Sequence, residues 1–259
     1  MSEKRRIEVC IISDVHLGTH ACHAKELNRY LKSIQPNMLI INGDWLDIWH
    51  FSAGYFPKEH IENVFLVLDF ARQGIPVYYI AGNHDDTIRD FLDFKFDTIE
   101  IKDEIFLDLD GKKHWIFHGD KYDLSVGGSA RWLAKLGGRS YDQIFRLNRY
   151  INKIRMKLGK DRIYLSKLIK DKVKSFVKSK VQDFEDVALE IAIKEKYDCV
   201  ICGHIHKPQD RIVANSEGSV RYLNSGDWVE NLTALEYNNG DWEIFYYWHD
   251  LQFKDIDRS

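Results

Sequence analysis

Five short segments of this chain each end an apolar run with a group of side chains that can bind metal ions. These segments are Asp14-Val15-His16, Gly43-Asp44, Gly82-Asn83-His84-Asp85, His118-Gly119-Asp120 and Gly203-His204-Ile205-His206. Imidazoles and carboxylates together, with almost no thiolate, are the ligands of borderline to hard divalent metals. Seven such groups are enough for two ions. The sequence therefore predicts a hydrolase that uses a pair of divalent metal ions.

Each segment follows a short run that is β-branched and largely apolar, as in a central strand covered on both faces. The runs cover residues 7–12, 38–41, 77–80, 115–117 and 199–202. In open α/β sheets, ligands lie at the carboxyl ends of the strands, so residues far apart in sequence meet there. One such group alone is more often an ordinary surface or core feature. Five groups at equivalent strand ends predict one shared metal site.

The remaining elements predict an α/β fold of two sheets flanked by helices. Helical patterns over residues 24–34 and 59–72 connect successive strands as βαβ units. Asp110-Gly111 is a strong hairpin signal, so the sheet turns antiparallel there. A further helix is expected over about 182–196. The last part of the chain predicts strands over 221–223, 233–237 and 242–248, all extending the second sheet.

Length and composition agree with one compact domain over residues 1–259. The charged start of the chain leads directly into a strand, and no apolar run approaches the length of a membrane span, so we expect a cytoplasmic protein. Cys199 and Cys202 are separated by an odd number of strand positions. They should point to opposite faces, which predicts neither a disulfide nor a shared metal.

One segment, an insertion over about residues 121–182, differs strongly in charge from the rest. It holds 17 Lys/Arg against 4 Asp/Glu, which leaves 20 against 36 for the remainder of the chain. Its apolar residues recur at helical spacing, and Lys167, Lys170, Lys174 and Lys178 form an opposite stripe. This pattern predicts a basic helical cap that holds lipid and meets phosphates or an anionic membrane surface. The alternative is a solvated cationic face packed on apolar partners.

The metal-binding segments follow the order Asp-x-His, Gly-Asp-x-x-Asp, Gly-Asn-His-Asp, His and Gly-His-x-His over residues 14 to 206. This order resembles the calcineurin-like metallophosphoesterases, and it implies a four-layer αββα sandwich of two mixed sheets. The resemblance implies that one ion is held by Asp14, His16 and His206, the other by Asn83, His118 and His204, and that Asp44 bridges them. A carboxylate shared between ions about 3.5–4 Å apart offsets their mutual repulsion.

Two such ions polarise a phosphate oxygen and lower the pKa of a water molecule, so in-line attack needs no covalent intermediate. His84 is then placed to donate to a phosphate oxygen or to protonate the leaving group, with Asp85 orienting its ring. Asp47 and Asp120 are expected to contact ligating groups, or otherwise to be solvated loop carboxylates.

A closer likeness extends over the opening run 13–18, the insertion from 132 to 178 and the tail 222–228. These segments resemble the branch of the family that hydrolyses UDP-2,3-diacylglucosamine in lipid A biosynthesis. The resemblance implies cleavage of the pyrophosphate to UMP and 2,3-diacylglucosamine 1-phosphate, with Mn²⁺, at the cytoplasmic face of the inner membrane. Candidate substrate-binding residues are Asn83, His84, Asp123, Lys170 and Lys174. The lipid A enzyme has Arg where this chain has His84, which keeps the general phosphoesterase pattern.

Two other functions remain open from the residues. A phosphodiesterase or nuclease would use the same metals, with the basic insertion holding a nucleic-acid backbone. Phe176 is the only aromatic residue among 167–180, however, so base stacking has little support and nucleic acid is not the expected partner. A binding scaffold without catalysis is the other alternative, and the complete set of candidate ligands argues against it.

Overall fold

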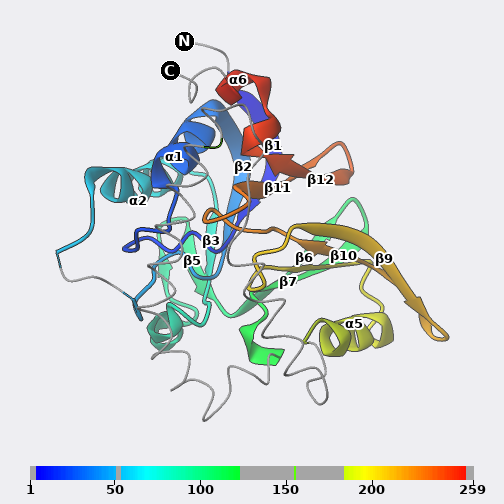
Figure 1. The fold of residues 1–259 in the computed structure, drawn as a ribbon. Helices are drawn as coiled ribbons and strands as arrows, with labels where there is room; N and C mark the ends of the chain where they lie inside the picture. The colour runs from blue at the N-terminus through cyan, green and yellow to red at the C-terminus, as the bar shows by residue number, and fades with distance from the viewer. Residues whose placement is uncertain (1–3, 51–53, 123–154, 156–183, 255–259) are drawn as a thin grey trace.

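Residues 4–50, 54–122, 155 and 184–254 are described in a computed structural model of the chain. In these parts, two mixed sheets pack face to face and helices lie on their outer sides (Figure 1). The predicted αββα sandwich is therefore confirmed. Almost all of the basic insertion predicted over about 121–182 lies outside the described residues. The same holds for the candidate substrate-binding residues Asp123, Lys170 and Lys174.

The first sheet has seven strands in the order β12-β11-β1-β2-β3-β5-β4. Their bounds are β1 Arg5–Ile12, β2 Ile34–Asn42, β3 Val77–Ile80, β4 Lys95–Phe96, β5 Ile99–Lys102, β11 Thr233–Asn238 and β12 Asp241–Tyr246. The four strands β1, β2, β3 and β5 run parallel, whereas β4, β11 and β12 are antiparallel to their neighbours. The carboxyl ends of β1, β2 and β3 therefore point to one edge of the sheet.

The second sheet has five strands in the order β6-β7-β8-β10-β9. Their bounds are β6 Glu104–Leu109, β7 Lys112–Phe117, β8 Cys199–Cys202, β9 Gln209–Asn215 and β10 Gly218–Asn224. In this sheet β7, β8 and β10 are parallel. The predicted Asp110-Gly111 hairpin joins β6 to β7, and both of its central residues have positive φ angles (52° and 76°), as this turn requires.

The helices occupy the two outer layers. Their bounds are α1 Ala24–Ser33, α2 Lys58–Arg72, α5 Phe184–Lys194 and α6 Leu251–Lys254, with short 3₁₀ turns η1 Asp86–Phe91, η2 Asp120–Tyr122 and η3 Tyr247–His249. In Figure 1, α1 and α2 lie beside the first sheet, and α5 lies on the far side of the second. The predicted helices over 24–34, 59–72 and 182–196 agree with α1, α2 and α5 within two residues.

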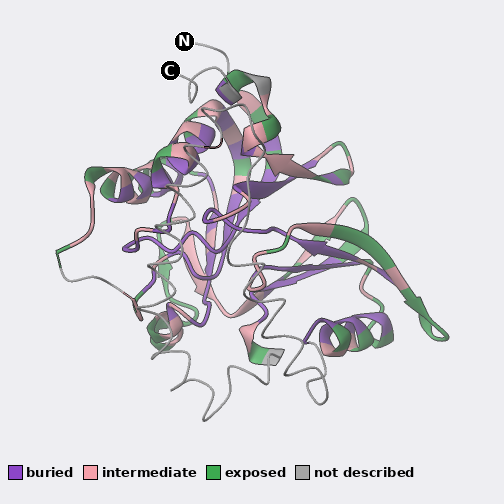
Figure 2. Cartoon of the chain, in the orientation of Figure 1, coloured by how far each residue is buried: buried purple, intermediate pink, exposed green. Residues whose placement is uncertain are grey.

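Three buried apolar clusters hold these layers together, as the purple inner surfaces in Figure 2 show. The middle cluster joins the two sheets through residues such as Ile40 and Ile201. An outer cluster packs α1 and α2 on the first sheet, and the other packs α5 on the second. Cys199 belongs to the middle cluster and Cys202 to the outer one, both as free thiols, which confirms that they face opposite ways.

The expected place of the last two strands is wrong. Residues 221–223 lie in β10 of the second sheet as predicted, but β11 and β12 join the first sheet. There β11 pairs antiparallel with β1, so that Ile11 faces Leu235. The local pattern predicts a buried strand correctly. It does not encode which sheet offers a free edge, and β1 has such an edge because β2 pairs with only one of its sides.

Candidate metal centre

Five strand ends from both sheets converge at one place. The loops after β1, β2 and β3 carry Asp14, Asp44 and Asn83, and the loops after β7 and β8 carry His118 and His204. Backbone hydrogen bonds join the first two loops, because the amides of Asp14 and His16 donate to the carbonyls of Gly43 and Asp44 at 3.1 and 2.9 Å. The structure thus brings together the segments that the sequence pattern singled out.

The backbone of these loops is strained at the candidate ligands themselves. Positive φ angles of 51–68° occur at Asp14, His16, Asp44, His204 and His206. Non-glycine residues in this left-handed region are uncommon and cluster at functional sites, where surrounding structure holds them in place.

Two of the accompanying glycines are required by close approach. A Cβ at Gly82 would lie 2.2 Å from Oδ1 of Asp44, and one at Gly43 would lie 2.2 Å from Nδ1 of His118. Each glycine therefore leaves room for the candidate ligand of a neighbouring loop. The Gly-Asp and Gly-Asn pairs of the sequence pattern have this steric basis.

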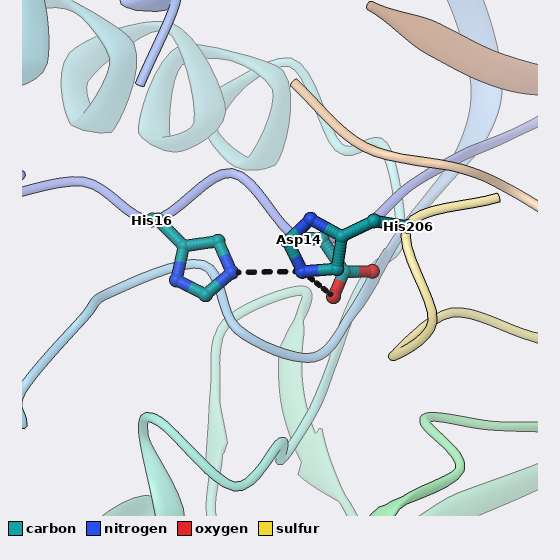
Figure 3. Close-up of side chains that lie close together, drawn as sticks. All are labelled: Asp14, His16 and His206. Atoms are coloured by element: carbon teal, nitrogen blue, oxygen red, sulfur yellow. Dashed lines mark hydrogen bonds and ion pairs between the residues drawn. The ribbon is translucent and has the colours of Figure 1, made fainter. Parts of the chain in front are cut away.

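The first group of side chains consists of Asp14, His16 and His206 (Figure 3). Nε2 of His206 lies 3.3 Å from Nε2 of His16 and 3.2 Å from Oδ1 of Asp14. Three ligating atoms of two imidazoles and one carboxylate thus face one another.

Asp44 lies between this group and a second one. Its Oδ2 is 3.3 Å from Nε2 of His118 and 3.9 Å from Nε2 of His16, while Oδ1 accepts a hydrogen bond of 2.8 Å from the amide of His84. Asp14, Asp44 and His118 also have ligating atoms within 4.8 Å of one another. One carboxylate oxygen of Asp44 therefore faces imidazoles from two different sheets.

The other two candidate ligands are Asn83 and His204. Asn83 is 7% exposed and precedes His84, whose amide donates to Asp44. The His204 ring packs edge-on against His118, with centroids 5.2 Å apart, and the His204 amide donates to Oδ2 of Asp14 at 3.0 Å.

Three imidazoles are oriented by hydrogen bonds at their outer nitrogen. Nδ1 of His16 lies 2.9 Å from Oδ2 of Asp47, Nδ1 of His118 lies 2.8 Å from the carbonyl of Asn42, and Nδ1 of His206 lies 2.8 Å from Oδ2 of Asp227. With Nδ1–H donating outward, each Nε2 keeps its lone pair for the centre. The expected contact of Asp47 with a candidate ligand is present.

Sequence reasoning did not single out Asp227 as a site residue. Asp227 follows β10 closely, as the candidate ligands follow their own strands. A search for polar residues just after β10 would therefore have found it.

The buried carboxylates of the centre strongly favour positively charged groups beside them. Burial alone would raise the pKa of Asp14, but the neighbouring His206 outweighs it and lowers this pKa to about 2. Burial would likewise lower the pKa of His118, yet Asp44 raises it to about 10. The carboxylates therefore stabilise cations beside them, whether imidazolium or metal.

The residues fit divalent metal ions. Oδ1 of Asp14, Oδ1 of Asn83 and Nε2 of His118 are buried, and none has a hydrogen-bond partner among the described residues. Such atoms cost about 1–3 kcal/mol each unless something satisfies them. Ligands about 2.0–2.2 Å from one ion lie roughly 3–3.5 Å from each other. The separations of 3.2 and 3.3 Å between the facing nitrogen and oxygen atoms agree with this spacing.

The role expected for Asp85 is wrong. Its carboxylate is fully buried and accepts hydrogen bonds from the amides of Trp45 and Gly82, at 2.9 and 2.7 Å, and from the Tyr79 hydroxyl. The carboxylate beside the His84 ring is that of Asp47, whose Oδ1 lies 3.0 Å from Nδ1 of His84. Adjacent side chains in this turn diverge, so Asp85 fastens the loops while Asp47 positions the imidazole.

Asp120 also differs from expectation, because its partner is Arg89 rather than a candidate ligand. The two side chains form a bidentate pair, with both distances 3.0 Å. Arg89 further donates to the carbonyls of Ala81 and Gly82 at 3.1 and 3.2 Å. It ties the loop after β7 to the loop after β3. No sequence motif marks Arg89, so this support was not predicted.

Comparison with known proteins identifies a family and several relatives. The family model described as calcineurin-like phosphoesterase matches residues 7–208. A protein of Aliivibrio fischeri named UDP-2,3-diacylglucosamine hydrolase is 24% identical over 256 residues, which are 95% of this chain and 99% of that protein. A protein of the same name from Histophilus somni is 27% identical over 236 residues, 87% of this chain and 94% of that protein.

Among solved structures, one described as a novel archaeal phosphodiesterase is 15% identical and covers 92% of this chain and 98% of its own, with a TM-score of 0.42. No helix in the described parts of this chain is both long and apolar enough to cross a membrane. Because the family model spans most of the sequence and includes every candidate ligand, the chain belongs to the calcineurin-like phosphoesterases.

Proposed function

We propose that this enzyme cleaves the pyrophosphate of a nucleotide-linked glycolipid, UDP-2,3-diacylglucosamine, to UMP and 2,3-diacylglucosamine 1-phosphate. The substrate is supported by relatives that carry the name UDP-2,3-diacylglucosamine hydrolase and match this chain over nearly all of its length. The chemistry is supported by the centre itself, which gathers imidazole, carboxylate and amide groups at the strand ends of both sheets.

The observation that carries the proposal is the position of Asp44. Its Oδ2 faces His16 on one side and His118 on the other. Asp14, His16 and His206 would hold one ion, Asn83, His118 and His204 the other, and Asp44 would bridge them. A carboxylate in this place suits two ions better than one, since it offsets their repulsion.

Two divalent ions, Mn²⁺ in this proposal, supply Lewis acidity that draws charge from a phosphate oxygen and makes water a better nucleophile near neutral pH. The residues of the chain do the rest. Asp47 holds the rings of His16 and His84 in place through its two oxygens. The His84 ring lies edge-on to the His16 ring, with the two ring centroids 4.6 Å apart. His84 donates a proton to a phosphate oxygen or to the departing group. Arg89 and Asp85 keep the loops at fixed separation.

The same proposal places the protein in the cytoplasm, at the inner face of the inner membrane where its lipid substrate lies. The support is the charge of the insertion over residues 121–182, with 17 cations against 4 anions. Nucleic acid is not the proposed partner.

The test is turnover of UDP-2,3-diacylglucosamine by metal-stripped protein, with and without added Mn²⁺, following UMP beside a chromogenic phosphodiester. Fast UMP release that depends on Mn²⁺ supports both substrate and metal. Turnover of the chromogenic ester without UMP release would keep the metal chemistry and reject the lipid substrate. The absence of turnover on either compound at saturating Mn²⁺ would reject the proposed function.

A further inference from the structure

Asp47 contacts three imidazoles rather than the two that the proposed function uses. Its Oδ2 bonds to His16, and its Oδ1 lies 3.1 Å from Nδ1 of His50 and 3.0 Å from Nδ1 of His84. We propose that Asp47, His50 and His84 form a third cation site, selective for zinc-like ions, whose occupation inhibits the enzyme. Only the inhibition rests on the proposed function; the site itself does not.

The atoms present suit a zinc ion. Two imidazole nitrogens and one carboxylate oxygen lie within 4.8 Å of one another. Two histidines with one carboxylate are a common zinc-binding set, completed by water in the fourth position. For ligands about 2.0–2.2 Å from a tetrahedral ion, neighbouring ligand atoms stand roughly 3.3–3.6 Å apart. The observed contacts with Oδ1, at 3.0 and 3.1 Å, must lengthen by a few tenths of an ångström to admit the ion.

The position of the His84 ring is a second observation that supports the site. Its Nδ1 is buried and lies 3.0 Å from Oδ1 of Asp47, and no described residue other than Asp47 is a hydrogen-bond partner of this atom. A buried nitrogen that faces a carboxylate oxygen can share an ion with it. The rings of Trp49 and His50 lie beside the same imidazole, with their centroids 4.9 and 5.3 Å from its own.

Asp47 can serve both sites at once. Oδ2 bonds to His16, which belongs to the proposed catalytic pair, and lies 3.2 Å from Nδ1 of His50, whereas Oδ1 faces His50 and His84. The backbone amide of His50 also donates to Oδ1 at 2.8 Å, and this fixes the start of the following loop against the carboxylate. An ion at Oδ1 would therefore meet preset ligands without dismantling the support of His16.

Occupation of this site has a direct chemical consequence. An ion that binds Nδ1 of His84 ties this imidazole to Asp47 and His50. The ring is then no longer free to meet a phosphate oxygen or the departing group. Zinc-like ions in excess should therefore slow turnover even when the catalytic pair is filled.

The experiment counts metal. Full-length protein loaded with Mn²⁺ is dialysed against increasing Zn²⁺, and total manganese plus zinc per chain is measured by atomic emission. We expect a plateau near three ions for the wild type and near two for His50→Gln, with at least a tenfold weaker third binding step, as loss of a ligand implies. His249→Gln, an exposed histidine elsewhere, is the matched control and should bind three.

A plateau at two ions in the wild type overturns the third site, and so does a third ion that persists in His50→Gln. Circular dichroism and thermal melting verify that the variant is folded. If the variant is not folded, a Co²⁺ titration of the wild type takes its place. A strong visible absorption band of four-coordinate cobalt in the third binding step supports the site, and the absence of this band overturns the site.

Activity gives a second readout. The Zn²⁺ concentration that halves Mn²⁺-dependent turnover should rise at least tenfold in His50→Gln, and an unchanged value would contradict the inhibitory role. If no phosphodiester is hydrolysed at all, the proposed function fails while the metal count still decides the third site.

Discussion

Nδ1 of His206 lies 2.8 Å from Oδ2 of Asp227, a fully buried carboxylate 21 residues further along the chain. The other oxygen of Asp227 accepts the amides of Glu230 and Asn231 at 3.1 and 2.7 Å. One carboxylate therefore fixes both a turn and an imidazole. The His206 ring is oriented by the fold before any ion binds.

Asp227→Asn should weaken metal binding about 10–100-fold, as is typical when the partner of a ligating histidine is lost. The amide keeps an oxygen for the turn but sets an N–H₂ against His206. Activity should recover as Mn²⁺ is raised, which a titration of turnover and of bound metal would show. Asp241→Asn, at an exposed carboxylate, is the control. Equal metal affinity in the Asp227 variant and the wild type would contradict the role.

Asp44→Asn should reduce turnover at least about 100-fold, equivalent to about 2.7 kcal/mol of transition-state stabilisation. The amide cannot supply the negative charge that two ions share. Bound metal should fall from two ions toward one, while circular dichroism remains that of the wild type. Near-normal turnover at saturating Mn²⁺ would defeat the assignment of Asp44.

His84→Ala should lower kcat about 10²–10³-fold with the catalytic metal pair retained, because general acid catalysis contributes on this order. Metal content is measured in parallel, at Mn²⁺ concentrations without added zinc. A variant that loses one of two ions would show that His84 is a ligand instead.

Asp85→Asn should act on stability. The carboxylate accepts from Trp45, Gly82 and Tyr79, and an amide nitrogen in its place would face a donor. We expect a loss of about 1–3 kcal/mol in the free energy of unfolding, measured with urea. Asp47→Asn is the contrast, since it should affect kcat more than stability. The opposite ranking of the two variants would return the positioning role to Asp85.

His114 predicts a pH dependence of stability away from the metal centre. Burial among Tyr237 and Trp242 lowers its pKa below the usual 6.5, and the hydrogen bond to the Lys112 carbonyl offsets this only partly. The folded state then binds fewer protons than the unfolded state. The contribution of neutral His114 to the free energy of unfolding is therefore fully present above about pH 6.5, and it declines as the pH falls toward the lowered pKa.

The comparison is His114→Phe against wild type, by urea unfolding between pH 7.5 and 5. The stability of the wild type relative to the variant should decrease as the pH is lowered through this window. A constant difference would show that His114 titrates alike in both states.

Much of the fold and the convergence of the candidate ligands were predictable, because strand ends are local features with a general consequence. Asp14, Asp44 and His118 each follow an apolar run, and parallel strands bring such ends to one edge. The ligand assignment itself remains a prediction. The geometry of the centre, in contrast, depends on a left-handed backbone conformation at several non-glycine residues. Sequence patterns do not indicate this conformation.

What escaped prediction depends on contacts between distant segments. Asp85 was expected to orient His84 because the two are adjacent, yet it is Asp47 that lies beside the ring. Arg89 carries no motif and is defined only by its partners in two other loops. The sheet chosen by β11 depends on the free edge of β1, which becomes visible only once the first sheet is assembled.

The pairing of β11 with β1 also bears on how the protein is made. Every candidate ligand has been synthesised by residue 206, but the amide of Trp228, which bonds the Asp14 carbonyl, and the strand that covers the β1 edge come later. On the ribosome, β1 cannot be paired on both sides until β11 has been synthesised. A chain that terminates shortly after His206 would carry all the ligands and still expose an unpaired apolar edge, which is prone to aggregation. Translation through β11 is thus a condition for covering the β1 edge.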